Sequence, residues 1–206
     1  MTEPTPAFEQ QRIDAILAAI PPDADRILDV GCCRHGRASR AWGNLHAALH
    51  QARPSATIVG IDSDNAAVTE MQAPGYDIRH IDAMNMEWAK PFDVIIAGEL
   101  IEHLVNVGRF IHQAALNLAG GGRLLVTTPN PDGYRYFLRA GSDNWTSDSH
   151  TCWIDPQQLD TLASHSGLEL VATKWLCRDT PTSRILQRLG KERVAANTYL
   201  GVLEWE

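Results

Sequence analysis

Three acids stand where short apolar segments end or are interrupted. Asp29 lies inside the apolar stretch 27–30, and Asp62 and Asp82 directly follow two further apolar stretches. Short apolar runs of this kind are typical of strands that are buried on both faces. Because the carboxyl ends of neighbouring parallel strands open onto one crevice, we expect the three carboxylates to converge on a single nucleoside there.

Asp62 and Asp82 suit different parts of a nucleoside. An acid at the end of the second strand is placed to accept hydrogen bonds from both ribose hydroxyls, although Asp62 could instead cap a helix that starts near Asn65. Asp82 could accept a hydrogen bond from the exocyclic amine of an adenine, with Ala83 and Met84 lining the ring. Met84 could equally belong to the ordinary core.

A glycine loop follows the first of these strands. Gly31 and Gly36 frame the loop, and Cys33 lies between them. Glycine has no β-carbon, so the backbone can approach a ligand closely at these positions. An apolar strand, an acid and a glycine turn that leads into a helix together predict a nucleotide-cofactor site.

Two histidines could act as a general base. His103 lies just beyond the carboxyl end of the strand expected at 92–97, and His150 lies on the long segment that follows the strand expected at 123–128. A base within hydrogen-bonding reach accelerates transfer of a group to a hydroxyl or an amine. The alternative is that His103 packs at the start of a helix and is bonded to the backbone.

The same histidines could instead bind a metal ion. Glu99 and Glu102 stand close to His103 in the chain, and His150 offers a further imidazole. Oxygen and imidazole ligands in this combination suit a hard divalent cation. A divalent metal therefore stays an open alternative, and we assign no metal ligand from the sequence.

Cations gather between the last two expected strands of an otherwise acidic chain. They are Arg178, Arg184, Arg188, Lys191 and Arg193. With Arg135 and Arg139, the segment 176–196 could form a lid that recognises a carboxylate or phosphate on the substrate. The alternative is a solvated helix with its apolar side chains turned inward.

Strands and helices alternate along the chain, which predicts a parallel sheet with helices on both faces. We expect strands at 26–30, 56–61, 78–81, 92–97, 123–128, 169–175 and 199–204. We expect helices at 8–20 within an N-terminal segment 1–22, at 37–50, from about 98 to 119, and from 156 to about 166. The glycines at 120–122 should end the third of these helices. No boundary divides residues 1–206, so we expect one domain.

The predicted helix at 37–50 carries two further histidines. His46 and His50 are four residues apart and could share a face, as metal ligands would. Because no acid lies near them in the chain, a solvated helix face is the preferred interpretation.

Composition limits the function classes. The chain has 206 residues, an apolar fraction of 44% and a net charge of −7, as in an ordinary acidic globular protein. This charge argues against broad binding of nucleic acid. Four scattered cysteines indicate neither a disulfide framework nor a zinc ribbon, and the first residues lack a secretory signal pattern. We therefore expect a cytoplasmic protein without a membrane partner. The sequence does not specify the oligomeric state.

The order of these motifs resembles the class I S-adenosylmethionine-dependent methyltransferases. The resemblance rests on the segments 28–32, 60–63, 81–83, 92–104, 121–130 and 150–156, and it covers about residues 24–175. It implies a Rossmann-like, doubly wound, seven-stranded sheet whose last strand runs antiparallel. It also implies that the segment at 199–204 inserts between neighbours near one edge of the sheet.

The glycine loop departs from the family pattern. The family has Gly-x-Gly-x-Gly, but here the second glycine is replaced by Cys33 and the third by His35, with Gly36 one position later. A β-carbon at Cys33 would crowd the methionine part of the cofactor unless the loop takes a different path. This departure bears on affinity more than on fold.

Patterns and resemblance together predict an enzyme that transfers a methyl group from S-adenosylmethionine to an oxygen or nitrogen of a small-molecule acceptor, with an anionic acceptor as one option. The predicted catalytic residues are His103 and His150. The predicted cofactor contacts are Asp29, Gly31, Cys33, Gly36, Asp62, Ser63, Asp82, Ala83 and Glu99.

Two alternatives stay open. Glu99, Glu102, His103 and His150 resemble a site in metal-dependent methyltransferases that modify the 2′-oxygen at RNA 3′ ends, and likewise in ubiquinone-pathway O-methyltransferases. The altered glycine loop would also suit a protein that binds the cofactor without turnover.

Overall fold

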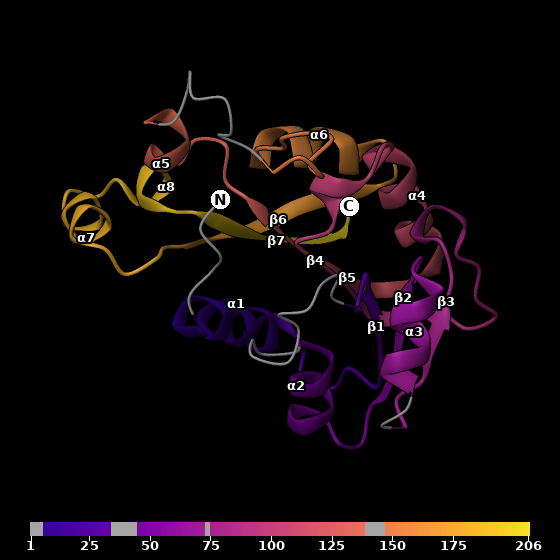
Figure 1. Ribbon diagram of the computed structural model, residues 1–206. Helices are drawn as coiled ribbons and strands as arrows, with labels where there is room; N and C mark the ends of the chain where they lie inside the picture. Colours follow the sequence, from indigo (N-terminus) through magenta and orange to yellow (C-terminus); the bar gives the residue numbers. More distant parts are fainter. Residues whose placement is uncertain (1–5, 34–44, 73–74, 139–146) are drawn as a thin grey trace.

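The computed structural model (Figure 1) describes residues 6–33, 45–72, 75–138 and 147–206. At its centre is a seven-stranded sheet with the strand order β3-β2-β1-β4-β5-β7-β6. The strands are β1 Arg26–Val30, β2 Thr57–Asp62, β3 Ile78–His80, β4 Phe92–Gly98, β5 Leu118–Pro129, β6 Leu168–Leu176 and β7 Thr198–Trp205. Strands β1 to β5 pair in parallel, and β7 runs antiparallel between β5 and β6. The predicted fold class and the inserted last strand are confirmed.

Helices cover both faces of the sheet (Figure 1). They are α1 Pro6–Ala19, α2 Leu45–Ala52, α3 Asn65–Gln72, α4 Val107–Asn117, α5 Tyr134–Phe137, α6 Pro156–Ser164, α7 Pro181–Arg188 and α8 Glu192–Ala195, with short 3-10 helices η1 Ala83–Asn85 and η2 Ile101–His103. On one face, Ile16 of α1 and Leu49 of α2 share an apolar cluster. On the other, Phe110 of α4 and Leu159 of α6 belong to a second cluster. Two apolar layers therefore hold the sheet in place from both sides.

The helix start predicted at Asp155-Pro156 is present. The Asp155 side chain accepts a hydrogen bond from the Gln158 backbone at 2.9 Å, and Gln158 Oε1 accepts one from the Asp155 backbone N–H at 3.0 Å. Thr180 and Ser183 form the same reciprocal cap at the start of α7. Such caps satisfy backbone N–H groups that a helix leaves unpaired, so they fix where each helix begins.

The single helix predicted between residues 98 and 119 is wrong. After β4 the chain forms η2, and Leu104 then adopts an extended conformation. The α4 helix starts afresh at Asn106, whose side chain accepts a hydrogen bond from the Arg109 backbone at 2.9 Å. Because of this break, the segment between β4 and α4 lies at the carboxyl ends of the central strands, where the candidate site lies.

The glycines at 120–122 do not end a helix. They lie inside β5, which already begins at Leu118. Gly121 has a φ of +81°, and the pairing of β5 with β4 changes register close by. Glycines without side chains tolerate such an irregularity, so they mark a bulge here.

The helix predicted at 37–50 is described only from Leu45 onward, because residues 34–44 lie outside the described part of the chain. Within the described residues, no helix has the length and apolar character that a membrane crossing requires.

Candidate functional site

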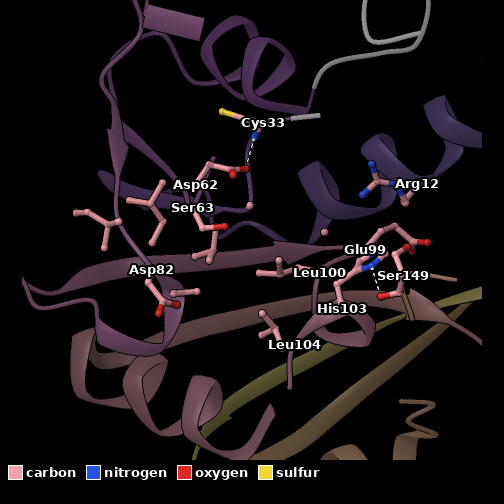
Figure 2. Close-up of a pocket in the computed structure, with 16 residues that line it drawn as sticks. Arg12, Cys33, Asp62, Ser63, Asp82, Glu99, Leu100, His103, Leu104 and Ser149 are labelled. Carbon is pink, nitrogen blue, oxygen red and sulfur yellow. Dashed lines mark hydrogen bonds between the residues drawn. The ribbon is translucent and has the colours of Figure 1, made fainter. Parts of the chain in front are cut away.

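A cavity of about 670 Å³ opens at the carboxyl ends of the central strands (Figure 2). Eight of the predicted site residues line it: Gly31, Cys33, Asp62, Ser63, Asp82, Ala83, Glu99 and His103. They come from the ends of β1, β2, β3 and β4 and from the segments that follow. The crevice expected from the sequence is therefore present, and most of the predicted residues meet in it.

Gly31 makes the turn at the end of β1. Its φ is +70°, which residues with a side chain rarely adopt. Its N–H donates to the Ile61 carbonyl at 2.8 Å, and a β-carbon at this position would lie 2.8 Å from Leu100 Cδ1. Glycine is therefore required here both for backbone conformation and for space.

Cys33 takes a path that the sequence did not reveal. Its backbone N–H donates to Asp62 Oδ2 at 3.0 Å. Its side chain is buried in a small apolar cluster with Cys32, Val68 and Ile78. Figure 2 shows the sulfur directed away from Asp62, so the backbone rather than the side chain of Cys33 faces the carboxylate. The crowding expected from this β-carbon is thereby avoided.

Asp62 is buried and held by two backbone donors. Cys33 N–H donates to Oδ2 at 3.0 Å and Asp64 N–H donates to Oδ1 at 2.9 Å. Helix α3 is capped instead by Asp64, whose side chain accepts hydrogen bonds from Ala66 and Ala67. The alternative role of Asp62 as the helix cap is therefore wrong. The Asp62 side chain also lines the cavity, where a ligand can approach it.

Asp82 and Ala83 also line the cavity, and Figure 2 shows Asp82 on the side away from Arg12 and Glu99. The Asp82 side chain accepts hydrogen bonds from Met84 N and Asn85 Nδ2, each at 2.9 Å. These bonds fix the start of η1. Ser63 also lines the cavity, and its carbonyl accepts a hydrogen bond from His80 Nε2 at 3.0 Å. A ring-shaped ligand group could lie between these elements.

Asp29 is not among the residues that line this cavity. Its buried carboxylate accepts a hydrogen bond from His46 Nδ1 at 3.1 Å. His46 is 0% exposed, so the predicted solvated face of its helix is wrong for this residue. The acid that pairs with it comes from another element, which spacing along one helix cannot reveal. Gly36 lies outside the described residues.

Sequence reasoning missed Arg12. This buried residue of α1 lines the cavity and donates two hydrogen bonds to Glu9, at 2.5 and 3.3 Å, and one to Thr127 Oγ1 at 3.3 Å. Figure 2 shows its guanidinium at the end of the cavity where Glu99 lies. The available signal was a cation, Arg12, inside the apolar helical pattern of residues 8–20.

Glu99 has an unusual backbone conformation. Its φ of +53° places it in the left-handed region, which costs energy for a residue with a side chain. Two hydrogen bonds hold it there. The Glu99 N–H donates to the Thr127 carbonyl at 2.8 Å and to Thr127 Oγ1 at 3.2 Å. Its Oε1 is buried and has no hydrogen-bond partner among the described residues. Burial raises the pKa of the Glu99 carboxyl, and Arg12 opposes the shift.

Glu102, His103 and His150 form a compact cluster beside the cavity. One side-chain N or O atom from each residue lies within 4.8 Å of the others. His103 Nδ1 donates to the Ser149 carbonyl at 3.1 Å, and Thr128 Oγ1 donates to Glu102 Oε2 at 2.9 Å. Burial and the nearby Glu99 raise the pKa of Glu102 to about 8. Burial and the neighbouring His103 lower the pKa of His150.

Aromatic rings continue from this cluster toward α5. The ring centroids of His103 and His150 are 4.8 Å apart, those of His150 and Trp153 are 5.9 Å apart, and those of Trp153 and Tyr136 are 4.5 Å apart. Burial and the carboxyl of Glu99 raise the pKa of Tyr136 to about 12. Flat apolar surfaces and titratable groups are thus brought together next to His103.

The cations of the predicted lid do not act as one group. Arg184 pairs with Asp179 at 2.5 Å and Arg193 pairs with Asp132 at 2.5 Å, both on the exposed surface. Arg178 instead lies over the Phe8 ring of α1, 5.3 Å from its centroid. Arg178 therefore extends toward α1, whereas its neighbours in the segment lie at the surface. Arg139 lies outside the described residues.

Comparison with known proteins supports the family and the fold. A family model described as "Methyltransferase domain" matches residues 7–173. A ubiquinone biosynthesis O-methyltransferase of Xylella fastidiosa is 27% identical over 183 residues, which are 82% of this chain and 70% of that protein. A probable S-adenosylmethionine-dependent methyltransferase of Mycolicibacterium smegmatis is 30% identical over 150 residues, which are 71% of this chain and 57% of that protein.

Solved structures share the fold at lower identity. The N-methyltransferase NodS from Bradyrhizobium japonicum, in complex with S-adenosyl-L-homocysteine, has a TM-score of 0.63 and 17% identity, covering 96% of this chain and 87% of that one. Magnesium protoporphyrin IX methyltransferase from Synechocystis, with bound S-adenosylmethionine, has a TM-score of 0.65 and 13% identity, covering 97% and 81%. The chain belongs to the methyltransferase-domain family and is a class I S-adenosylmethionine-dependent methyltransferase.

Proposed function

We propose that this methyltransferase acts on a small-molecule acceptor, at an oxygen or a nitrogen, and that a hydroxyl group is the preferred target. One observation carries the proposal: a single cavity has two chemically different ends. Asp62, Ser63 and Asp82 line one end, and Glu99 and His103 line the other. The first end suits a nucleoside, and the second suits a group that must lose a proton.

The first end fits the cofactor. Gly31 removes the β-carbon at the turn, and the Asp62 carboxylate, oriented by two backbone N–H groups, lines the cavity where it would meet the ribose hydroxyls. Asp82 and Ala83 would hold the adenine between them. When bound, S-adenosylmethionine supplies a methyl group already activated by its sulfonium. The residues of the chain therefore need to orient the acceptor and to keep water out.

Arg12 is the cation that we assign to the carboxylate of the methionine part. It is buried at the wall of the cavity, and its guanidinium donates a hydrogen bond to Thr127 Oγ1 of β5. An arginine fork matches a carboxylate in geometry and charge. Glu9 already engages Arg12 through two hydrogen bonds and so holds its orientation before a ligand arrives.

His103 is the residue that we assign to proton removal. Because Nδ1 donates to the Ser149 carbonyl, the neutral ring carries its proton on Nδ1 and leaves Nε2 as an acceptor. His103 lines the cavity, so Nε2 can accept the proton of a hydroxyl there. The preference for oxygen is supported by the Xylella relative, which is named an O-methyltransferase.

The assignment is tested by measuring S-adenosylhomocysteine production with a panel of hydroxylated and amino small molecules. With a productive hydroxyl acceptor, His103→Gln should lower kcat by about 10²-fold or more and leave cofactor affinity nearly unchanged. His112→Gln is the matched control, because His112 is exposed on α4. Equal activity of the two variants would remove His103 from the mechanism, and product from amino acceptors alone would overturn the preference for oxygen.

A metal-assisted reaction is a second candidate, because one feature of the site favours it. The N and O atoms of Glu102, His103 and His150 lie within 4.8 Å of one another, and His150 Nδ1 is buried without a hydrogen-bond partner among the described residues. A divalent cation bound there would polarise an acceptor oxygen. The acidic balance of the chain weighs against RNA as the acceptor in this variant.

The metal candidate is tested with chelated protein. If it holds, EDTA should abolish turnover, Mn²⁺ or Mg²⁺ should restore it, and Mn²⁺ should raise the melting temperature of the wild type but not that of Glu102→Gln. Full activity in EDTA, with no Mn²⁺-dependent shift, would exclude it. Including an RNA oligonucleotide with a free 3′ end in the acceptor panel decides between the two substrate classes.

A further inference from the structure

The segment between β6 and β7 differs in charge from the rest of the molecule. Residues 177–196 hold five cations and two acids, a net charge of +3, while the whole chain carries −7, so the remainder carries −10. Arg178 lies over the Phe8 ring, and Arg184 and Arg193 pair with acids, but these contacts leave Arg188 and Lys191 to be explained. A local reversal of charge on this scale calls for an explanation of its own.

The inner side of α7 is packed against neighbouring parts of the same segment. Leu186 of α7 contacts a small apolar cluster formed by Cys177, Ala195 and Ala196. Ser183 is buried and donates a hydrogen bond to the Arg178 carbonyl at 2.5 Å. This packing fixes α7 in orientation, so the opposite side of the helix has to face outward.

The outer side of α7 presents apolar and basic side chains together. Ile185 is 57% exposed and Leu189, one turn further along the chain, is 67% exposed. Arg188 and Lys191 stand next to them, are exposed, and form no ion pair with any residue in the described ranges. Figure 1 shows α7 projecting at one end of the molecule. We name Ile185, Arg188, Leu189 and Lys191 the α7 face.

We propose that the α7 face binds a membrane surface that contains anionic lipid. Exposed aliphatic side chains flanked by cations are typical of helices that lie in the lipid interface, where the apolar groups enter the acyl boundary and the cations meet the headgroups. Two aliphatic side chains fall far short of the roughly 800 Å² per partner that a stable protein interface covers. A deformable lipid surface can accept so small and convex a face.

The overall charge of the protein does not prevent such binding. At physiological ionic strength, charges separated by more than about 8 Å are largely screened. An approach through the α7 face therefore brings the two cations Arg188 and Lys191 to the lipid and keeps the acidic remainder at a distance. The absence of spanning segments and of a signal pattern predicted no membrane partner, but neither feature bears on binding through a helix at the surface. The proposal does not depend on the identity of the methyl acceptor.

The test is co-sedimentation of the full chain with phosphatidylcholine vesicles that contain or lack phosphatidylglycerol. The wild type should bind only the anionic vesicles and should dissociate as salt is raised. Arg188→Gln/Lys191→Gln should weaken binding by roughly fivefold for each cation removed. Leu189→Asn should weaken it by about tenfold, because an apolar side chain no longer enters the interface.

Leu116→Asn is the matched control. Leu116 is a leucine on α4 with a similar exposed fraction of 65%, and it lies outside the α7 face. The Leu116 variant should bind vesicles like the wild type, and all variants should retain their affinity for S-adenosylhomocysteine if they fold. Equal binding of the Leu189 and Leu116 variants, or no vesicle binding by the wild type, would overturn the proposal. A concentration-dependent dimer that Leu189→Asn abolishes would assign the face to a second copy instead.

Discussion

The carboxylate of Asp62 is oriented before any ligand arrives. Its oxygens accept hydrogen bonds from the backbone N–H groups of Cys33 and Asp64, one from the glycine turn and one from the start of the next helix. The carboxylate therefore ties together two segments that border the cavity. A side chain held in this way does not have to give up rotational freedom when it binds a ligand.

Asp62→Ala should weaken binding of S-adenosylhomocysteine by about 1.5–3 kcal/mol, the usual value of hydrogen bonds to a charged group. Calorimetric titration measures the loss directly. Asp64→Ala is the control, because it removes the cap of α3 and should lower stability by about 1 kcal/mol without a comparable change in affinity. Similar affinity losses in the two variants would show that Asp62 acts only through folding.

Glu102 should make the stability of the protein depend on pH. Its pKa is raised to about 8 in the folded protein, whereas an unfolded glutamate titrates near about 4.3. Between these values the unfolded chain loses a proton that the folded protein keeps, so stability falls as pH rises through this window. The slope is at most about 1.4 kcal/mol per pH unit for one group.

Glu102→Gln removes this titration, and its amide oxygen can still accept the hydrogen bond from Thr128. Urea unfolding at pH 5, 6, 7 and 8 in EDTA should therefore give a flatter profile for the variant than for the wild type. Parallel profiles would mean that Glu102 titrates normally in the folded state.

Individual site residues could be predicted only where the residues that indicate them lie in one short segment of the chain. Asp62 and Asp82 stand directly after apolar strands, and both line the cavity. The pairing of Asp29 with His46 joins β1 to α2, and the contact of Arg12 with Thr127 joins residues 115 positions apart. Such partners depend on how elements pack, and one sequence does not record that packing.

At the scale of elements, β2 approaches its neighbours closely because of Gly60. A β-carbon there would lie 2.5 Å from Ile78 Cδ1 and 2.6 Å from Cys32 Sγ. Gly60 thus lets the side chains of β3 and of the cofactor loop pack against β2. The apolar cluster that holds the Cys33 side chain away from Asp62 depends on the same closeness.

Gly60→Ala should therefore destabilise the protein by about 1–3 kcal/mol, the usual cost of overpacking a buried site. It should also weaken cofactor binding, since Cys32 is displaced next to Cys33. Gly120→Ala is the control, because nothing lies within 4 Å of a β-carbon at that position. Chemical denaturation measures both variants, and an equal effect of the two would contradict the packing argument.

Strands were easier to predict than helix boundaries. Each predicted strand is present. Strands β1, β2 and β4 are mostly buried and carry the clearest apolar runs, whereas β3 and β6 are largely exposed or half-buried. The region after β4 was predicted poorly because apolar residues continue through η2 into α4 without a break in their pattern. Asn106 is the local signal for the start of α4, because it is a capping residue directly before the helix. The continuous apolar pattern around it predicted a longer helix instead.

On the scale of the whole molecule, one edge of the sheet carries the chemistry. The carboxyl ends of β1, β2 and β4 border the cavity, α1 closes it with Arg12, and the apolar layers on both faces keep the strands in register. The projecting α7 face lies outside this arrangement. The cofactor cavity and the α7 face are therefore separate parts of the molecule.

The most direct test of the central claim is a crystal structure of this protein with S-adenosylhomocysteine. The account predicts that both ribose hydroxyls lie within hydrogen-bonding distance of the Asp62 carboxylate, that the adenine lies beside Asp82 and Ala83, and that the ligand's carboxylate contacts Arg12. A ligand bound elsewhere, or a ribose that does not contact Asp62, would contradict it.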